Sequence, residues 1–222
     1  AQVSYFSNLM NVRKRQVICN LAVSPITVQA GAMQWMIGNV NATTGIKGVG
    51  DLFSKAVRGK VTGESAIKPE YTGDGLMILE PTYRHILLLD LEAWNGSIVL
   101  DDGLFLACES KLQQRAVARS NVSSALAGNE GLFNLGIQGN GVLCLESPCP
   151  QEELIEIELQ NDVVKIDGNM AIAWSGSLTF TVERSGKSLI GSAASGEGLV
   201  NVFRGTGKVL LAPVDRVNRF PS

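Results

Sequence analysis

Short runs in which apolar and polar residues alternate recur along the chain, and such alternation is typical of half-buried β-strands. One pattern occurs three times: an apolar residue, four residues, a glycine, one residue, and then Met or Phe. The copies are Ile26, Gly31 and Met33; Ile98, Gly103 and Phe105; and Val163, Gly168 and Met170. Because glycine adopts conformations that other residues avoid, each glycine predicts the tight turn of a hairpin.

A second pattern follows each copy of the first and combines an acidic residue, a glycine and a leucine. It occupies residues 73–76, 129–132 and 196–199. Eleven residues after its last glycine, each copy is followed by an apolar run that opens with a β-branched residue. The pattern therefore predicts a turn and then a strand, in the three ranges Ile86–Leu89, Val142–Leu145 and Val209–Ala212.

Together the two patterns predict one all-β domain over residues 1–222, built from three related β units. The units span about residues 15–95, 96–160 and 161–215. A single unit has too few strands to bury its own apolar face, so the three are expected to pack on one another. A pseudo-threefold arrangement is the simplest expectation for such a chain.

The first and third units each depart from this scheme. The first unit is longer, and its surplus around residues 48–62 has the i, i+3, i+4, i+7, i+8 spacing of one short amphipathic helix, formed by Val49, Leu52, Phe53, Ala56 and Val57. In the third unit, Lys165 occupies the position that holds Val28 and Leu100 in the other units. This lysine predicts that the strand is shifted or bulged.

One more strand is predicted over Gln151–Gln160, where apolar and acidic residues alternate. The expected inward residues are Ile155, Ile157 and Leu159, and the expected outward residues are Glu156 and Glu158.

The composition is that of a globular protein with an ordinary core. Hydrophobic residues make up 45% of the chain, charged residues 18%, and the formal net charge is −2. No apolar run is long enough to cross a bilayer, and residues 1–10 lack the order of a secretory signal. A cleaved signal stays open because the chain does not begin with methionine. We expect a cytoplasmic protein.

Four cysteines allow two disulfides in an oxidising compartment. The repeat places Cys108 and Cys144 at positions that are apolar in the other units, so both are predicted to be small core residues. Cys149 lies between two prolines and is the one candidate for an exposed thiol. These placements favour a reduced compartment, cytosolic or organellar.

His85 is the only histidine, which leaves few candidates for general-base or metal chemistry. The repeat places it at the entry to a strand, where a surface histidine without catalytic role is expected. We therefore predict no catalytic residue, no cofactor and no metal site.

Two glycine-containing segments invite comparison with nucleotide-binding motifs. Ser185–Ser188 resembles part of a phosphate-binding loop, but Thr181 stands where that motif needs a glycine, so a hairpin turn is predicted. Gly136, Gly139 and Gly141 are predicted to be turn glycines, because no helix follows to complete a dinucleotide site.

The charge balance does not favour a nucleic-acid partner, since 19 basic residues face 21 acidic ones. Basic residues cluster at Arg13–Arg15 and Lys47–Lys68, where Phe53 and Tyr71 are candidates for base stacking. A solvated loop is the favoured interpretation of both clusters. The acidic stretch Glu146–Asp162 would repel a phosphate backbone.

Acidic and aromatic residues supply the remaining candidates. Acid catalysis needs two carboxylates across one cleft, which the sequence does not establish for Asp101, Asp102, Glu152, Glu153, Glu156 and Glu158. These acids are interpreted as solvated turn and strand residues. The three tryptophans are candidates for a ligand pocket or an interface; Trp35 and Trp174 lie on predicted strands and are expected in the core, and Trp94 is the third.

Several segments resemble the altered-inheritance-of-mitochondria 24 family. The resemblance rests on Val28–Met33, Gly59–Ser65, Asp101–Ala107 and the second glycine pattern, and it covers about residues 15–215. It implies a fold similar to the tryptophan RNA-binding attenuation protein, an antiparallel double-stranded β-helix or β-sandwich. Fungal members are mitochondrial and linked to inner-membrane organisation; the shorter chain here fits the bacterial members better. The resemblance brings no catalytic residues.

These observations favour a non-enzymatic binding or scaffold protein that assembles through β edges or the amphipathic segment at residues 49–57. Protein partners or self-association are expected, nucleic acid is not, and peripheral membrane association stays open. The alternative is a small-molecule or RNA-binding module of the attenuation-protein type. An enzyme, a hydrolase using carboxylates, comes third.

Overall fold

The structure is a computed structural model that describes residues 14–44, 68–118, 133–184 and 199–213. Strands dominate these residues, together with two 3-10 turns, η1 (Leu91–Trp94) and η2 (Gln151–Glu153). The strands are β1 (Ile18–Asn20), β2 (Ile26–Val28), β3 (Met33–Thr43), β4 (Glu70–Leu79), β5 (His85–Asp90), β6 (Ser97–Leu100), β7 (Phe105–Glu109), β8 (Gln113–Ala118), β9 (Phe133–Gln138), β10 (Val142–Ser147), β11 (Ile155–Asp167), β12 (Ala171–Ser175), β13 (Thr179–Arg184) and β14 (Leu199–Leu211). In the part of the chain that the structure describes, no helix reaches the length and apolar character needed to cross a membrane.

The strands form two curled antiparallel sheets of seven strands each. In the first sheet the order is β1-β4-β2-β7-β10-β5, with β3 also paired to β4; in the second it is β11-β14-β12-β6-β9-β8, with β13 also paired to β14. The predicted all-β fold is therefore confirmed.

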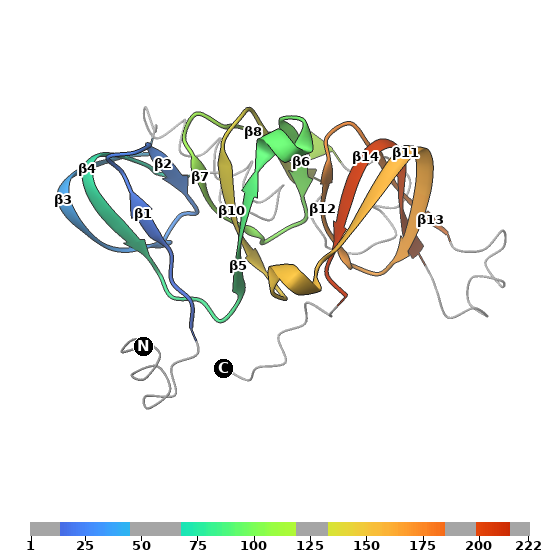
Figure 1. Ribbon diagram of the computed structural model, residues 1–222, viewed down its shortest axis with the longest axis horizontal. Helices are drawn as coiled ribbons and strands as arrows, with labels where there is room; N and C mark the ends of the chain where they lie inside the picture. The colour runs from blue at the N-terminus through green and yellow to red at the C-terminus, as the bar shows by residue number, and fades with distance from the viewer. Residues whose placement is uncertain (1–13, 45–67, 119–132, 185–198, 214–222) are drawn as a thin grey trace.

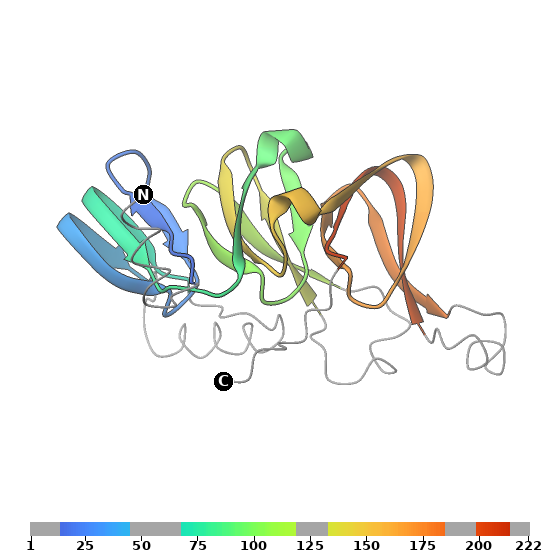
Figure 2. The ribbon, with the colours of Figure 1, turned by 60° about the horizontal axis from the view of Figure 1, so that its bottom comes forward.

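Three groups of strands lie in a row along the longest axis of the molecule (Figures 1 and 2). We refer to β1–β4 as the N-terminal group, β5–β10 as the middle group and β11–β14 as the C-terminal group. Neighbouring groups are joined by strand pairing, β2 with β7 at the first junction and β6 with β12 at the second. Descent of the groups from one repeated unit, their pseudo-threefold relation and the likeness to the attenuation protein stay predictions.

The three predicted turn glycines do lie in turns. Gly31, Gly103 and Gly168 have positive φ angles of 79°, 71° and 62°, a region that favours glycine. No heavy atom lies within 4 Å of the place where a Cβ would stand, so the requirement is conformational. The predicted hairpins are wrong, however: β2 and β3 pair with β4 on its opposite edges, and β6 and β7 belong to different sheets. Each turn carries the chain across to another edge or another sheet.

The second glycine pattern has a different role from the one predicted. Residues 73–76 lie inside β4 rather than in a turn. Gly75 lies opposite Gly38 on β3, where a side chain would collide with the facing backbone, so these glycines allow the two curled strands to approach. Residues 129–132 lie outside the described residues, and the third copy contributes only Leu199, the first residue of β14.

The strands expected after this pattern are confirmed in β5, in β10 and at the end of β14, which stops at Leu211. The irregularity predicted at Lys165 is not found there; β11 has a register shift between Leu159 and Asp162 instead. Lys165 itself pairs regularly with Val202. The helix predicted over residues 49–57 lies outside the described residues.

The strand predicted over Gln151–Gln160 is confirmed in part. Residues 151–153 form η2, and β11 begins at Ile155. Leu159 is buried and Ile157 packs against the same core cluster, as expected, whereas Ile155, on the same face of the strand, is 48% exposed. Ile155 is the first residue of β11.

Candidate functional site

One sheet face at the N-terminal end of the molecule is apolar and open to solvent. Side chains alternate along a strand, and in β4 Met77 and Leu79 point into the core. Leu76 and Ile78 therefore point to the opposite face. Leu76 is 40% exposed, and Ile78 contributes to none of the three core clusters.

The neighbouring strands extend this face. Ile18 of β1 and Trp35 of β3 flank Ile78 on either side, and Ile37 of β3 lies beside Leu76. Ile18 is 67% exposed, Trp35 52% and Ile37 62%, whereas Ile78 at their centre is only 3% exposed. We call Ile18, Trp35, Ile37, Leu76 and Ile78 the N-terminal apolar face.

The strand that carries Trp35 and Ile37 also has an open edge. β3 runs for 11 residues and pairs along its whole length with β4, and no other described strand pairs with it. Its sequence, MQWMIGNVNAT, contains no ionisable side chain and no proline. Natural sheets usually protect such an edge with charges or proline, because it accepts a further strand readily.

The C-terminal end of the molecule is built differently, although it also ends in long strands. On β13 and β14, a carboxylate oxygen of Glu183 lies 2.7 Å from the Arg204 guanidinium and the other lies 3.9 Å from Lys165 Nζ. The hydrogen bond from Arg204 lowers the pKa of Glu183. On β14, Lys208 Nζ lies 2.8 Å from Glu156 and 3.6 Å from Glu158.

The three tryptophans lie in three different groups of strands. Trp174 is 4% exposed, as predicted for a core residue. Its ring centroid lies 5.1 Å from those of Phe180 and Phe203. Trp94 in η1 is also buried. The prediction of a buried Trp35 is wrong, because its strand lies at the end of the sheet and no described layer covers that face.

The four thiols are free, and all four are buried. Cys108 and Cys144 lie in the core as predicted, and burial raises the pKa of each thiol to about 12. The expectation of an exposed Cys149 is wrong: it is 2% exposed, and its carbonyl oxygen accepts a 2.6 Å hydrogen bond from Ser147. The turn between two prolines folds inward and covers the side chain.

His85 lies close enough to the predicted acids Glu152 and Glu153 of η2 to feel their charges, whereas the other predicted acids lie elsewhere. His85 is half-buried at the start of β5. Its pKa is lowered, mainly because of this burial and secondly because of the positive charge of the nearby Arg15. Asp101 and Asp102 lie at the turn before β7, whereas the acids of β11 face Lys208. Among the described residues, no three His, Cys, Asp or Glu side chains gather closely enough to hold a metal ion.

The candidates for base stacking are engaged in packing. Tyr71 is 6% exposed, and the Lys68 ammonium lies over the Phe105 ring, 4.8 Å from its centroid. Lys14 lies over the Tyr83 ring at 5.0 Å. Phe53, Arg13 and the rest of the Lys47–Lys68 cluster lie outside the described residues, as does Ser185–Ser188.

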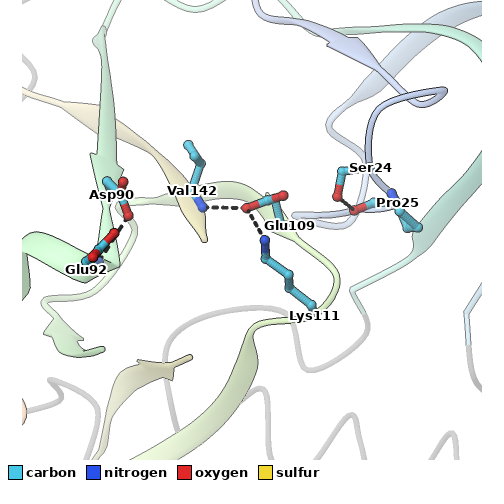
Figure 3. Close-up of polar contacts among 7 residues, drawn as sticks. All are labelled: Ser24, Pro25, Asp90, Glu92, Glu109, Lys111 and Val142. Atoms are coloured by element: carbon cyan, nitrogen blue, oxygen red, sulfur yellow. Dashed lines mark hydrogen bonds and ion pairs between the residues drawn. The ribbon is translucent and has the colours of Figure 1, made fainter. Parts of the chain in front are cut away.

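Glu109 is a polar contact that the sequence did not single out. It ends β7 and accepts hydrogen bonds from the Val142 backbone N–H at 2.8 Å and from Lys111 at 3.2 Å (Figure 3). Burial raises the pKa of Glu109, but these donors outweigh burial and the pKa is lowered overall. Because Glu109 also pairs with Ile26 of β2, it stabilises the first junction rather than a reaction centre.

The predicted turn glycines beyond the repeat behave in two ways. Gly139 and Gly141 lie between β9 and β10 as expected, whereas Gly136 lies within β9. There its close neighbours are the side chains of Val117 and Arg115, so it permits close packing of β8 on β9.

The N-terminal apolar face was not predicted, although the sequence carries a signal for it. No Asp, Glu, Lys or Arg occurs between Arg15 and Lys47, so β1, β2 and β3 are all without charge. A strand at the surface of a sheet usually alternates apolar with charged residues. This stretch without charges is the signal in the sequence for an apolar sheet face.

Comparisons with known proteins agree with this fold. An uncharacterized protein of Streptococcus pyogenes serotype M6, M6_Spy0233, is 31% identical over 194 residues, which cover 84% of this chain and 75% of that protein. The crystal structure of protein SPYM3_0169 from Streptococcus pyogenes superimposes with a TM-score of 0.66 at 27% identity, covering 92% of this chain and 91% of that one. The model of the family described as mitochondrial biogenesis AIM24 matches residues 8–214. The chain belongs to the AIM24 family.

Proposed function

We propose that this chain is a non-enzymatic binding or scaffold protein that engages protein partners through the N-terminal apolar face and the open edge of β3. The observation that carries the proposal is the exposure of Ile18, Trp35 and Ile37 on one face, beside a strand edge without charges.

Two physical arguments support a protein as the occupant. Exposing a contiguous apolar patch to water costs about 25 cal/mol of free energy for each Å². A partner that covers the patch removes this cost. A free strand edge offers backbone donors and acceptors in register, which a second strand satisfies directly. Trp35 lies in this face, and tryptophan is among the residue types that contribute most at protein interfaces.

The second candidate, a small-molecule or RNA-binding module, finds less support among the described side chains. RNA binding by stacking requires exposed rings beside cations. Tyr71 is buried and Lys68 is engaged by Phe105, which leaves Tyr83, 63% exposed beneath Lys14, as a ring of this kind among the described residues. A filter-binding titration with single-stranded RNA across salt concentrations tests it, and a steep loss of affinity with salt would favour RNA over the protein partner proposed here.

A photoreactive amino acid placed at position 35 in living cells tests the proposal. The matched control is position 163 of β11, because Val163 is 45% exposed on an edge strand at the opposite end. We expect crosslinked adducts at position 35 that are absent at position 163. The same adducts at both positions, or no adduct at position 35, would contradict the proposal.

A further inference from the structure

The two internal junctions are built on the same rule. At the first, Val28 of β2, three residues before Gly31, pairs with Ala107 of β7, which follows Gly103. At the second, Leu100 of β6, three residues before Gly103, pairs with Ala173 of β12, which follows Gly168. In both, the strand that precedes a glycine turn in one group pairs with the strand that follows the glycine turn of the next group.

Each junction also covers the centre of the outer face of a strand triplet, although the flanking residues Leu88 and Glu156 stay exposed. At the first, the triplet is β5-β10-β7, and its central residue Cys144 joins the core that contains Val28. At the second, the triplet is β11-β14-β12, and its central residue Leu210 joins the core that contains Leu100. A triplet of this kind is therefore made to lie against a neighbouring group.

The N-terminal group presents the same triplet with no described group in front of it. Its strands are β1-β4-β3, and its central residue is Ile78, flanked by Ile18 and Trp35. The N-terminal apolar face is thus a junction face that lacks its neighbour within the chain. A further set of strands is the occupant that such a face fits.

The C-terminal end does not supply that neighbour. The position of Val28 and Leu100, both fully buried at the junctions, is taken there by Lys165, whose side chain is 58% exposed. Joining the C-terminal end of one copy to the N-terminal end of the next would bury this ammonium against Trp35, at a large desolvation cost. The ion pairs of Lys165 and Glu183 therefore close one end of the row, and among the described strands only the N-terminal end stays open.

We propose that two copies of the chain associate head to head, with β3 pairing antiparallel to β3 of the second copy about a twofold axis at Met36. This deepens the proposed function, on which it rests, by naming a second copy as the occupant of the face. The register places Trp35 of each copy opposite Ile37 of the other, on the same side of the joined sheet. A twofold axis brings identical residues close together, and the absence of any ionisable side chain in β3 removes the repulsion that charges would cause.

The association is closed. Each copy contributes its one open end, and the two charged ends point away from each other, so growth stops at two chains.

Sedimentation velocity and light scattering of the purified chain measure the assembly directly. We expect twice the chain mass of 23.7 kDa. Trp35→Lys weakens dimerisation by a factor of about 100 or more, because two ammonium groups are placed in an apolar contact. The matched control Val163→Lys leaves the dimer unchanged.

Tryptophan fluorescence gives an independent readout. Trp94 and Trp174 are buried, so Trp35 is the tryptophan whose surroundings change on association. Dilution of the wild type through the dissociation constant shifts its emission to longer wavelength, and Trp35→Phe removes the shift.

A cysteine at the axis tests the register. The native thiols are buried, so Met36→Cys supplies the reactive thiol, and a short bismaleimide joins two chains through it. Lys165→Cys, at the closed end, gives no crosslinked dimer. Equal crosslinking of the two variants overturns the proposed axis.

A wild type that stays monomeric at 100-fold the concentration used for the crosslinking overturns the head-to-head dimer. That result leaves the proposed function standing if position 35 still captures other proteins in cells. Adducts of two copies alone support the dimer and contradict a foreign partner, so the two proposals fail by different outcomes.

Discussion

The two ends of the molecule present sheet faces of similar geometry but opposite chemistry. At the C-terminal end, Glu183 and its cations cover the outer face of the last strands with ion pairs. At the N-terminal end, Ile18, Trp35 and Ile37 stand exposed with no charge among them. A row of packed strand groups needs a polar face at each end to stay soluble as a monomer. Among the described strands only the C-terminal end meets this need, and this difference supports the N-terminal end as the proposed binding surface.

The largest expected effect comes from shortening one aromatic side chain at each end. Phe203 is fully buried between Trp174 and Phe180, so Phe203→Ala lowers the free energy of unfolding by about 3–5 kcal/mol. Trp35→Ala changes it by about 0.5 kcal/mol or less at protein concentrations below the dissociation constant, because few contacts are lost. Urea denaturation of both variants checks this, and equal losses would show that Trp35 belongs to the core.

In all three groups the sequence predicts the turns better than the pairing of the strands, and the reason is physical. The turns at Gly31, Gly103 and Gly168 are predictable, because a local requirement for positive φ decides them. The pairing of the strands around each turn is not, because it depends on which distant edge is free. Glycines 73 and 75 misled for the same reason, since they serve a close approach of β3 and β4 rather than a turn.

Burial was predicted well only where the neighbouring layer lies within the chain. Cys108, Cys144 and Trp174 are buried as their apolar positions indicate. Trp35 has the same strand pattern, yet its outer face meets no described layer of the fold. Alternation specifies which side chains share a face, but the sequence of one chain does not specify what covers that face.

Removing the charge that closes the C-terminal end is the next effect in size. Lys165→Leu restores the residue type found at Val28 and Leu100, so the end becomes able to accept the N-terminal apolar face of another copy. We expect species larger than two chains, with end-to-end association strengthened about tenfold, which corresponds to about 1.4 kcal/mol. Sedimentation velocity measures this. Lys111→Leu is the control, since its side chain is 59% exposed in the middle group; growth in that variant would assign the effect to added surface apolarity alone.

The smallest expected effect is the response of the charged end to acid. Arg204 lowers the pKa of Glu183 in the folded chain below its value in the unfolded chain, so the ion pair contributes stability that is fully present above the unfolded pKa. This contribution is lost as the pH falls through the lowered folded pKa. Glu183→Gln therefore lowers the free energy of unfolding by about 0.5 kcal/mol at pH 7, and the difference from the wild type shrinks in acid. Urea denaturation at pH 7 and at pH 3 measures the difference.

The apolar end has no titrating group in β3, so dimerisation at pH 7 and at pH 5 should have the same dissociation constant. A dimer that weakens in step with the titration of Glu183 would place the contact at the charged end and reverse the assignment of the two ends.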